Sequence, residues 1–111
     1  MPLAEAASRL QNAVSRRSGE EFYRLTRSLK LSAGLKDQLN RAASSIALNL
    51  AEGRAKSTLP DQLKFFNIAF GSLRESQAIL ILSSLEGTEA WQTLDRLAAQ
   101  LYCLTKNAKG G

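Results

Sequence analysis

Apolar side chains recur at alternating steps of three and four residues through most of the chain, a spacing that places them on one face of an α-helix. The first stripe consists of Leu3, Ala7, Leu10, Val14, Ser18, Phe22, Leu25 and Leu29. It predicts a helix over residues 3–30. Gly19 interrupts the stripe at a cost of about 1 kcal/mol relative to alanine, so we expect a weak point or bend there rather than an end.

Three further stripes predict helices over residues 35–53, 60–84 and 89–107. We expect Gly53 to end the second helix in the left-handed conformation that glycine adopts at low cost. Thr58 is the expected N-cap of the third helix, with Pro60 in its first turn, and Thr88 is the expected N-cap of the fourth. Four helices with short links and no alternating strand pattern indicate an all-α chain, a single domain over residues 1–111 folded as an antiparallel up-down-up-down four-helix bundle.

The third predicted helix has more apolar surface than one side of a bundle needs. Beside its main stripe, a second row contains Phe65, Ile68, Ala69, Ile79 and Leu82. A helix that is apolar over so wide an arc is either central in its domain or covered by another subunit. We therefore take Phe65, Ile68 and Ile79 as candidate residues of an oligomer interface. The small pair Gly71 and Ser72 in the same helix suggests a place where another helix approaches closely.

The composition removes most catalytic chemistry. The chain has no histidine and a single cysteine, Cys103, so we expect no metal site and no cofactor. It also lacks a glycine-rich phosphate loop, and Glu52 and Glu75 are its most plausible carboxylate pair. We predict no catalytic residues and no enzymatic activity. An enzyme would require an enclosed pocket around Asn49, Glu52 and Glu75.

The positive charge is concentrated in the first half of the chain. The net charge is +5, and residues 1–56 account for all of it, with ten basic and five acidic side chains. On the first predicted helix, a row of arginines lies about opposite the apolar stripe: Arg9, Arg16, Arg24 and Arg27. Together with Arg54 and Lys56 in the basic loop expected after the second helix, these residues are candidate contacts for the backbone of RNA or DNA. A solvated helix face explains the same pattern, and the absence of interleaved aromatic side chains argues against the reading of unpaired bases.

Polar side chains also interrupt the second helix beside its apolar run. Ser45 and Asn49 lie one helical turn apart, and a carboxamide near a core must find hydrogen-bond partners. We predict a structural polar network rather than a ligand site, composed of Arg41, Ser45, Asn49, Glu52 and Glu75. No run approaches the roughly 18–20 apolar residues of a membrane span, so we expect a cytoplasmic protein without a membrane partner.

Three segments resemble a known family. RAASSIALNLAEG at residues 41–53 is similar to the central signature of the 23S rRNA intervening-sequence proteins, in which Arg-Ala-Ala leads into Ser-Ile-Pro-x-Asn-Ile-Ala-Glu-Gly. FYRLTR at residues 22–27 and FFNIAFGSLRE at residues 65–75 resemble further family segments. The resemblance spans residues 22–104, and Ala47 occupies the position of the family's usual proline, so we expect a straighter second helix here.

The resemblance implies a four-helix bundle and a ring-like homo-oligomer, because relatives such as the accessory proteins of diversity-generating retroelements form homopentamers. Those relatives bind nucleic acid and a reverse transcriptase through basic surfaces, whereas the role of the intervening-sequence members is obscure. Our hypothesis from the sequence is therefore a closed homo-oligomer that associates with RNA through the basic face of the first helix. The alternative is a protein-interaction scaffold with no nucleic-acid role.

Overall fold

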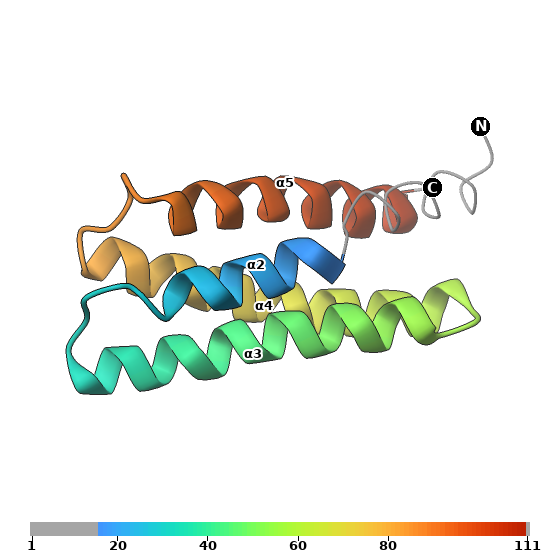
Figure 1. Cartoon of the computed structure of the whole chain (residues 1–111). Helices are drawn as coiled ribbons and strands as arrows, with labels where there is room; N and C mark the ends of the chain where they lie inside the picture. Colours follow the sequence, from blue (N-terminus) through green and yellow to red (C-terminus); the bar gives the residue numbers. More distant parts are fainter. Residues whose placement is uncertain (1–15, 111) are drawn as a thin grey trace.

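The structure, a computed structural model, describes residues 16–110, with side chains described for residues 19–106. Its four helices are α2 (Arg16–Thr26), α3 (Ala33–Ala55), α4 (Leu59–Leu82) and α5 (Glu89–Gly110). Successive helices run in opposite directions, and each packs against its two neighbours in the order α2, α3, α4, α5 and back to α2 (Figure 1). The predicted all-α, up-down-up-down four-helix bundle is confirmed, and it measures 45 × 22 × 20 Å.

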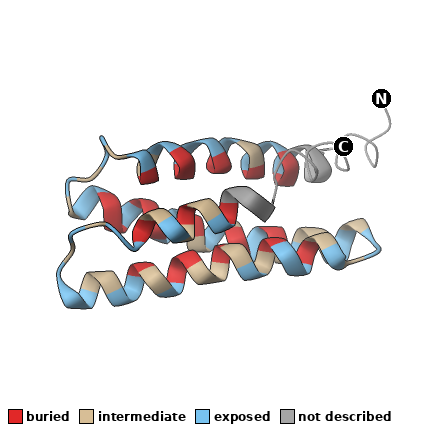
Figure 2. Ribbon diagram, in the orientation of Figure 1, coloured by how far each residue is buried: buried red, intermediate tan, exposed pale blue. Residues whose placement is uncertain are grey.

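The core is built from the predicted stripes, because the buried positions face one another across the bundle axis (Figure 2). Its largest fully buried side chains are Phe22, Leu39, Ile46, Leu50, Phe66, Leu73, Leu80, Leu94, Leu97, Leu101 and Leu104. Burying a leucine or phenylalanine side chain contributes roughly 1.5–3 kcal/mol. These contacts are therefore the main force that holds the four helices together.

α2 approaches α3 closely at Gly19, a buried residue of α2. A Cβ atom at this position would lie 3.2 Å from Cδ1 of Leu50 and 3.3 Å from Cα of Ala47. Two small residues thus face each other where these helices touch. The half of the predicted first helix that precedes residue 16 lies outside the described residues.

The first helix ends earlier than predicted, at Thr26 rather than residue 30. After Thr26 the backbone changes to bonds between residues three apart, such as that from Arg27 N to Arg24 O at 3.2 Å. The Thr26 hydroxyl donates to the carbonyl of Tyr23 at 2.7 Å. These contacts satisfy carbonyls of the last turn. Leu29, the last residue of the apolar stripe, packs against the core although it lies beyond the end of the helix.

The prediction that Gly53 ends α3 in a left-handed conformation is wrong. The helix continues to Ala55, and no described glycine has a positive φ. Gly53 is buried because the ring of Phe66 from α4 packs against it: an added Cβ would lie 2.6 Å from Cε1 and 2.9 Å from Cδ1 of that ring. At this position, glycine allows two helices to approach rather than one helix to stop.

The predicted beginnings of the last two helices are confirmed at their caps. Thr58 Oγ1 accepts a hydrogen bond from Asp61 N at 3.4 Å, with Pro60 in the first turn of α4. Thr88 Oγ1 accepts one from Trp91 N at 3.3 Å. Of the small pair Gly71 and Ser72, only Ser72 meets another helix: its hydroxyl lies 2.7 Å from Ser45 Oγ on α3, whereas no described atom lies within 4 Å of a Cβ built at Gly71.

Replacing Gly53 with alanine tests the α3–α4 contact. We expect Gly53→Ala to lower the free energy of unfolding, because overpacking against a buried ring costs about 1–3 kcal/mol and the gain in helix propensity is at most about 1 kcal/mol. The matched control is Gly71→Ala on α4, which should stabilise the chain by up to about 1 kcal/mol. Urea unfolding followed by circular dichroism measures both, and equal stabilisation by the two substitutions would contradict the contact.

Candidate nucleic-acid interface

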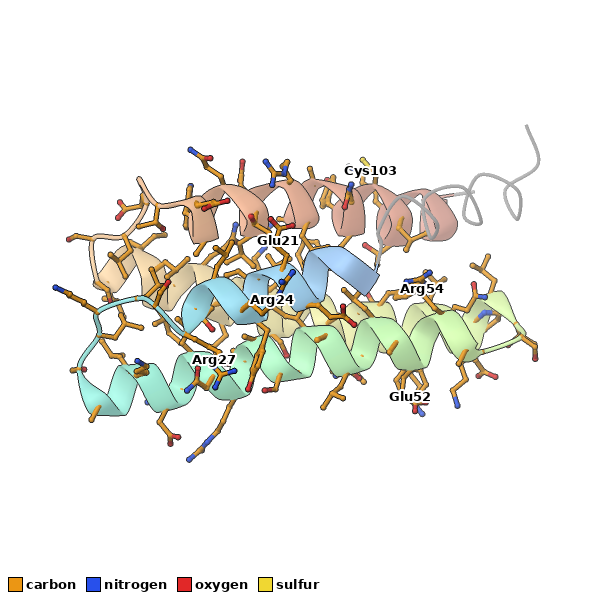
Figure 3. The ribbon with its side chains drawn as sticks, in the orientation of Figure 1. Glu21, Arg24, Arg27, Glu52, Arg54 and Cys103 are labelled. Carbon is orange, nitrogen blue, oxygen red and sulfur yellow. The ribbon has the colours of Figure 1, made fainter. Side chains whose placement is uncertain are left out.

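The cations of α2 form the part of the predicted basic face that the structure describes. Arg24 and Arg27 are exposed along this helix, and Lys30 is exposed just after it (Figure 3). Within residues 19–106, no ion pair involves any of these three side chains. Their charges are thus available to an external anion. Glu21, beside Arg24, is the acidic residue nearest in sequence.

A fourth cation, missed in the sequence, joins this end of the bundle. The ammonium group of Lys36, in the first turn of α3, donates to the carbonyl of Arg27 at 3.4 Å. This bond brings the start of α3 beside the end of α2. We call Arg24, Arg27, Lys30 and Lys36 the α2 basic surface.

The other predicted contacts do not join that surface. Arg9 and the side chain of Arg16 lie outside the described residues. Arg54 is half-buried near the end of α3 that is farther from Lys36 (Figure 3). Glu52, in the same part of α3, points away from α2. Lys56 Nζ lies 3.4 Å from Glu52 Oε2 and 5.1 Å from the centre of the Phe65 ring. Because an intramolecular carboxylate accompanies Lys56, it offers less positive charge to a polyanion than the α2 cations do.

The predicted polar network is smaller than expected and includes a residue from another helix. Asn49 Nδ2 donates to the Ser45 carbonyl at 2.8 Å and to Ser45 Oγ at 3.1 Å. Ser72 Oγ, on α4, donates to Ser45 Oγ at 2.7 Å. This network links α3 to α4, and the contribution of Ser72 requires the helix register, which sequence spacing alone does not give.

Three other residues assigned to the network lie elsewhere. Arg41 pairs with Asp37 at 2.8 Å on the exposed side of α3, Glu52 pairs with Lys56, and Glu75 is exposed on α4. The open depression of about 460 Å³ beside Asn49 is lined by α3 residues, and neither Glu52 nor Glu75 is among them. The two carboxylates therefore do not converge on Asn49.

The predicted oligomer residues divide between surface and core. Ile68 is 45% exposed and Phe65 is half-buried, whereas Ile79 is only 3% exposed and packs in the bundle core. Ile79 is therefore unavailable to a partner, because α4 turns this side toward its own bundle. Leu48 on α3 is 68% exposed and was missed, since its position lies outside the apolar stripe of its helix.

A group of aromatic and cationic side chains lies between α4 and α5. The rings of Phe70 and Tyr102 have centres 6.5 Å apart. The Arg74 guanidinium lies 4.7 Å from the centre of the Phe70 ring, and Lys106 Nζ donates to the Tyr102 hydroxyl at 2.8 Å. This hydrogen bond, with the charge interaction between the same two groups, raises the pKa of Lys106 above its usual value. No spacing within a single helix indicates this group, because its members come from two helices.

The described residues contain no set of three cysteine, aspartate or glutamate side chains arranged to hold a metal ion. None of the helices in this part of the chain combines the length and apolar character needed to cross a membrane.

Comparison with known proteins supplies the family. A family model described as 23S rRNA-intervening sequence protein matches residues 11–110. The chain belongs to the 23S rRNA-intervening sequence protein family. The family match begins at residue 11, so it includes part of the first predicted helix that the sequence motifs alone did not reach. Searches of curated proteins and of solved structures returned no match.

A double-mutant cycle tests the hydrogen bond between α3 and α4 in this family member. We expect Ser45→Ala and Ser72→Ala each to lower the free energy of unfolding by about 0.5–1.5 kcal/mol. The double variant should lose less than the sum, because both changes remove the same hydrogen bond. Ser44→Ala is the control, since its hydroxyl bonds only within α3, to the Asn40 carbonyl at 2.8 Å. Strict additivity in chemical unfolding would show that the two hydroxyls are not coupled.

Proposed function

We propose that this protein is a non-enzymatic, RNA-associated helical bundle that binds phosphate backbone through the α2 basic surface and assembles as a homo-oligomer in the cytoplasm. The observation that carries the proposal is that Arg24, Arg27 and Lys30 are exposed and make no ion pair within residues 19–106, whereas Arg41 and Lys56 each have a carboxylate. The family description, which names ribosomal RNA, supports RNA as the anion.

The physical basis of binding is electrostatic. Each cation that neutralises a phosphate releases counterions from the nucleic acid, so the affinity falls steeply with added salt. Guanidinium groups are suited to this role because they form paired hydrogen bonds with phosphate oxygens. Since backbone contacts carry no sequence information, the α2 basic surface accounts for association with RNA but not for the choice of a particular RNA.

The proposal of no enzymatic role depends on the residues present. The full chain has no histidine to act as a general base near neutral pH. The carboxylates considered as a pair, Glu52 and Glu75, lie on different helices, and neither lines the depression beside Asn49. Their arrangement supports a surface role for the protein rather than acid–base catalysis.

Self-association is proposed on the outer side of the α3–α4 pair. Leu48 is adjacent in sequence to Asn49, and Ile68 lies one turn before Ser72, so the two exposed side chains lie near the hydrogen-bonded contact of Ser45, Asn49 and Ser72 between the helices. Covering them with another copy removes apolar surface from water. A contact between unlike surfaces of identical chains closes into a ring when the rotation permits, in agreement with the pentamer that the family resemblance implies.

The RNA proposal predicts a salt-dependent affinity that charge reversal on α2 reduces. In a titration of a short RNA duplex followed by fluorescence anisotropy, Arg24→Glu with Arg27→Glu should weaken binding and lower the slope of log affinity against log salt by about 2. The control is Lys64→Glu with Arg96→Glu, which changes the net charge equally on α4 and α5. No binding by the parent chain at low salt, or equal losses in both double variants, would overturn the assignment.

The self-association proposal predicts that a charge at Ile68, on the outer side of the α3–α4 pair, separates the subunits. Light scattering should give a mass several times the 12.1 kDa chain for the parent and a lower mass for Ile68→Glu. Ile81→Glu, at an apolar position that is 52% exposed near the end of α4 and lies outside the row of Ile68, is the matched control and should keep the parent mass. A parent that is monomeric at every concentration would leave Leu48 and Ile68 without a partner copy and would exclude this part of the proposal.

A further inference from the structure

The α4–α5 groove and the side chains beside it have features that backbone binding through α2 does not use. Two aromatic rings, Phe70 and Tyr102, lie between two cations, Arg74 and Lys106. Tyr102 is 47% exposed, so much of its ring is accessible although it lies on a packed helix. The planes of the two rings are inclined by 47°, an arrangement that leaves them unstacked on each other.

Alternation of rings and cations suits one ligand chemistry in particular. Unpaired nucleobases stack on aromatic side chains and on arginine guanidinium planes, while cations beside the rings neutralise the connecting phosphates. The Arg74 guanidinium is held in place from two sides, by the Phe70 ring at 4.7 Å and by the side-chain amide oxygen Oε1 of Gln77, to which it donates at 2.8 Å. A fixed guanidinium plane loses less conformational entropy when a base stacks on it.

The groove also has a size and lining suited to a base. It has a volume of about 350 Å³ and is lined by Arg74, Gln77, Asp95, Ala98, Ala99 and Tyr102. This volume is at the lower end of the roughly 300–1,000 Å³ that small-molecule pockets occupy. Two alanines leave room between the larger side chains for a flat ring.

Asp95 decides which part of a nucleotide fits the groove. Its carboxylate repels phosphate, so the phosphate is expected beside Lys106, at the Tyr102 end, while the base lies in the groove. A carboxylate accepts hydrogen bonds from exocyclic amino groups such as that of cytosine. These two effects favour an amino-bearing base over a bare phosphate or a sulfate ion.

We propose that the α4–α5 groove is a binding site for unpaired, amino-bearing nucleobases of single-stranded RNA, with Tyr102 and Arg74 as the stacking groups. This inference rests on the proposed function that the chain associates with RNA, and it adds a base-contacting site separate from the α2 basic surface. A duplex does not compete for the groove, because its base faces are stacked inside the helix.

The test compares two single strands of equal length and charge, oligocytidine and an abasic backbone, together with the RNA duplex that probes the α2 surface. The parent should bind oligocytidine more tightly than the abasic strand. Tyr102→Leu, which keeps apolar bulk but removes the aromatic face, should weaken oligocytidine binding by roughly fivefold to a hundredfold. The same variant should leave the affinities for the abasic strand and the duplex unchanged.

Tyr102→Phe separates stacking from the hydrogen bond to Lys106. It keeps the ring and removes the hydroxyl, so most of the oligocytidine affinity should remain. Circular dichroism and light scattering of each variant show whether its fold and assembly are those of the parent.

The outcomes distinguish this site from the α2 surface. Equal binding of oligocytidine and the abasic strand by the parent would overturn the groove proposal while duplex binding left the α2 proposal intact. A parent protein that does not bind the duplex, but binds oligocytidine with a base-dependent affinity that Tyr102→Leu abolishes, would support the groove proposal and reject the α2 proposal. A Tyr102→Leu variant with altered mass and unchanged RNA affinity would show that the groove is a protein interface, and would also overturn the proposal.

Discussion

The contact between Gly53 and the ring of Phe66 is the constraint on which the arrangement of α3 and α4 depends. The ring occupies the space that a side chain at residue 53 would need, so this pair allows the two longest helices to approach at one register. The hydrogen bond between Ser45 and Ser72 lies farther along the same pair of helices and requires the same register. A shift of one turn would lose both contacts, and it would also displace Leu48 and Ile68 from their positions near the Ser45–Ser72 hydrogen bond.

The sequence predicted the architecture well because a bundle depends on a repeated property. Each stripe needs only apolar side chains at helical spacing, and replacing one leucine with another apolar residue does not change the prediction. Caps formed by neighbouring residues, such as Thr58 and Thr88, were predicted for the same reason, since all their atoms belong to one short segment. Local signals therefore gave the number, order and direction of the helices.

The errors arose where the answer depends on what lies opposite. Gly53 has the composition of a helix end, and only the position of Phe66 shows that it is a packing site. From the sequence, Ile79 belongs to a plausible outer row of α4. In the structure, the packing of α4 against its neighbours turns this position inward, and Ile79 is buried. The group around Tyr102 combines residues from α4 and α5, so no spacing within either helix indicates it. The α2 basic surface was predicted in part, because Arg24 and Arg27 share a helix and Lys36 does not.

The segment at residues 41–53, which marks the family most clearly in the sequence, has a simple explanation in the structure. Its inward positions Ala42, Ala43, Ile46, Leu50 and Gly53 are all buried. These five of the thirteen residues thus specify how one helix fits among its neighbours. A family relationship detected through these buried positions therefore reports a common fold. The outward residues of the segment are not constrained by the packing, so different relatives can use them to bind different partners.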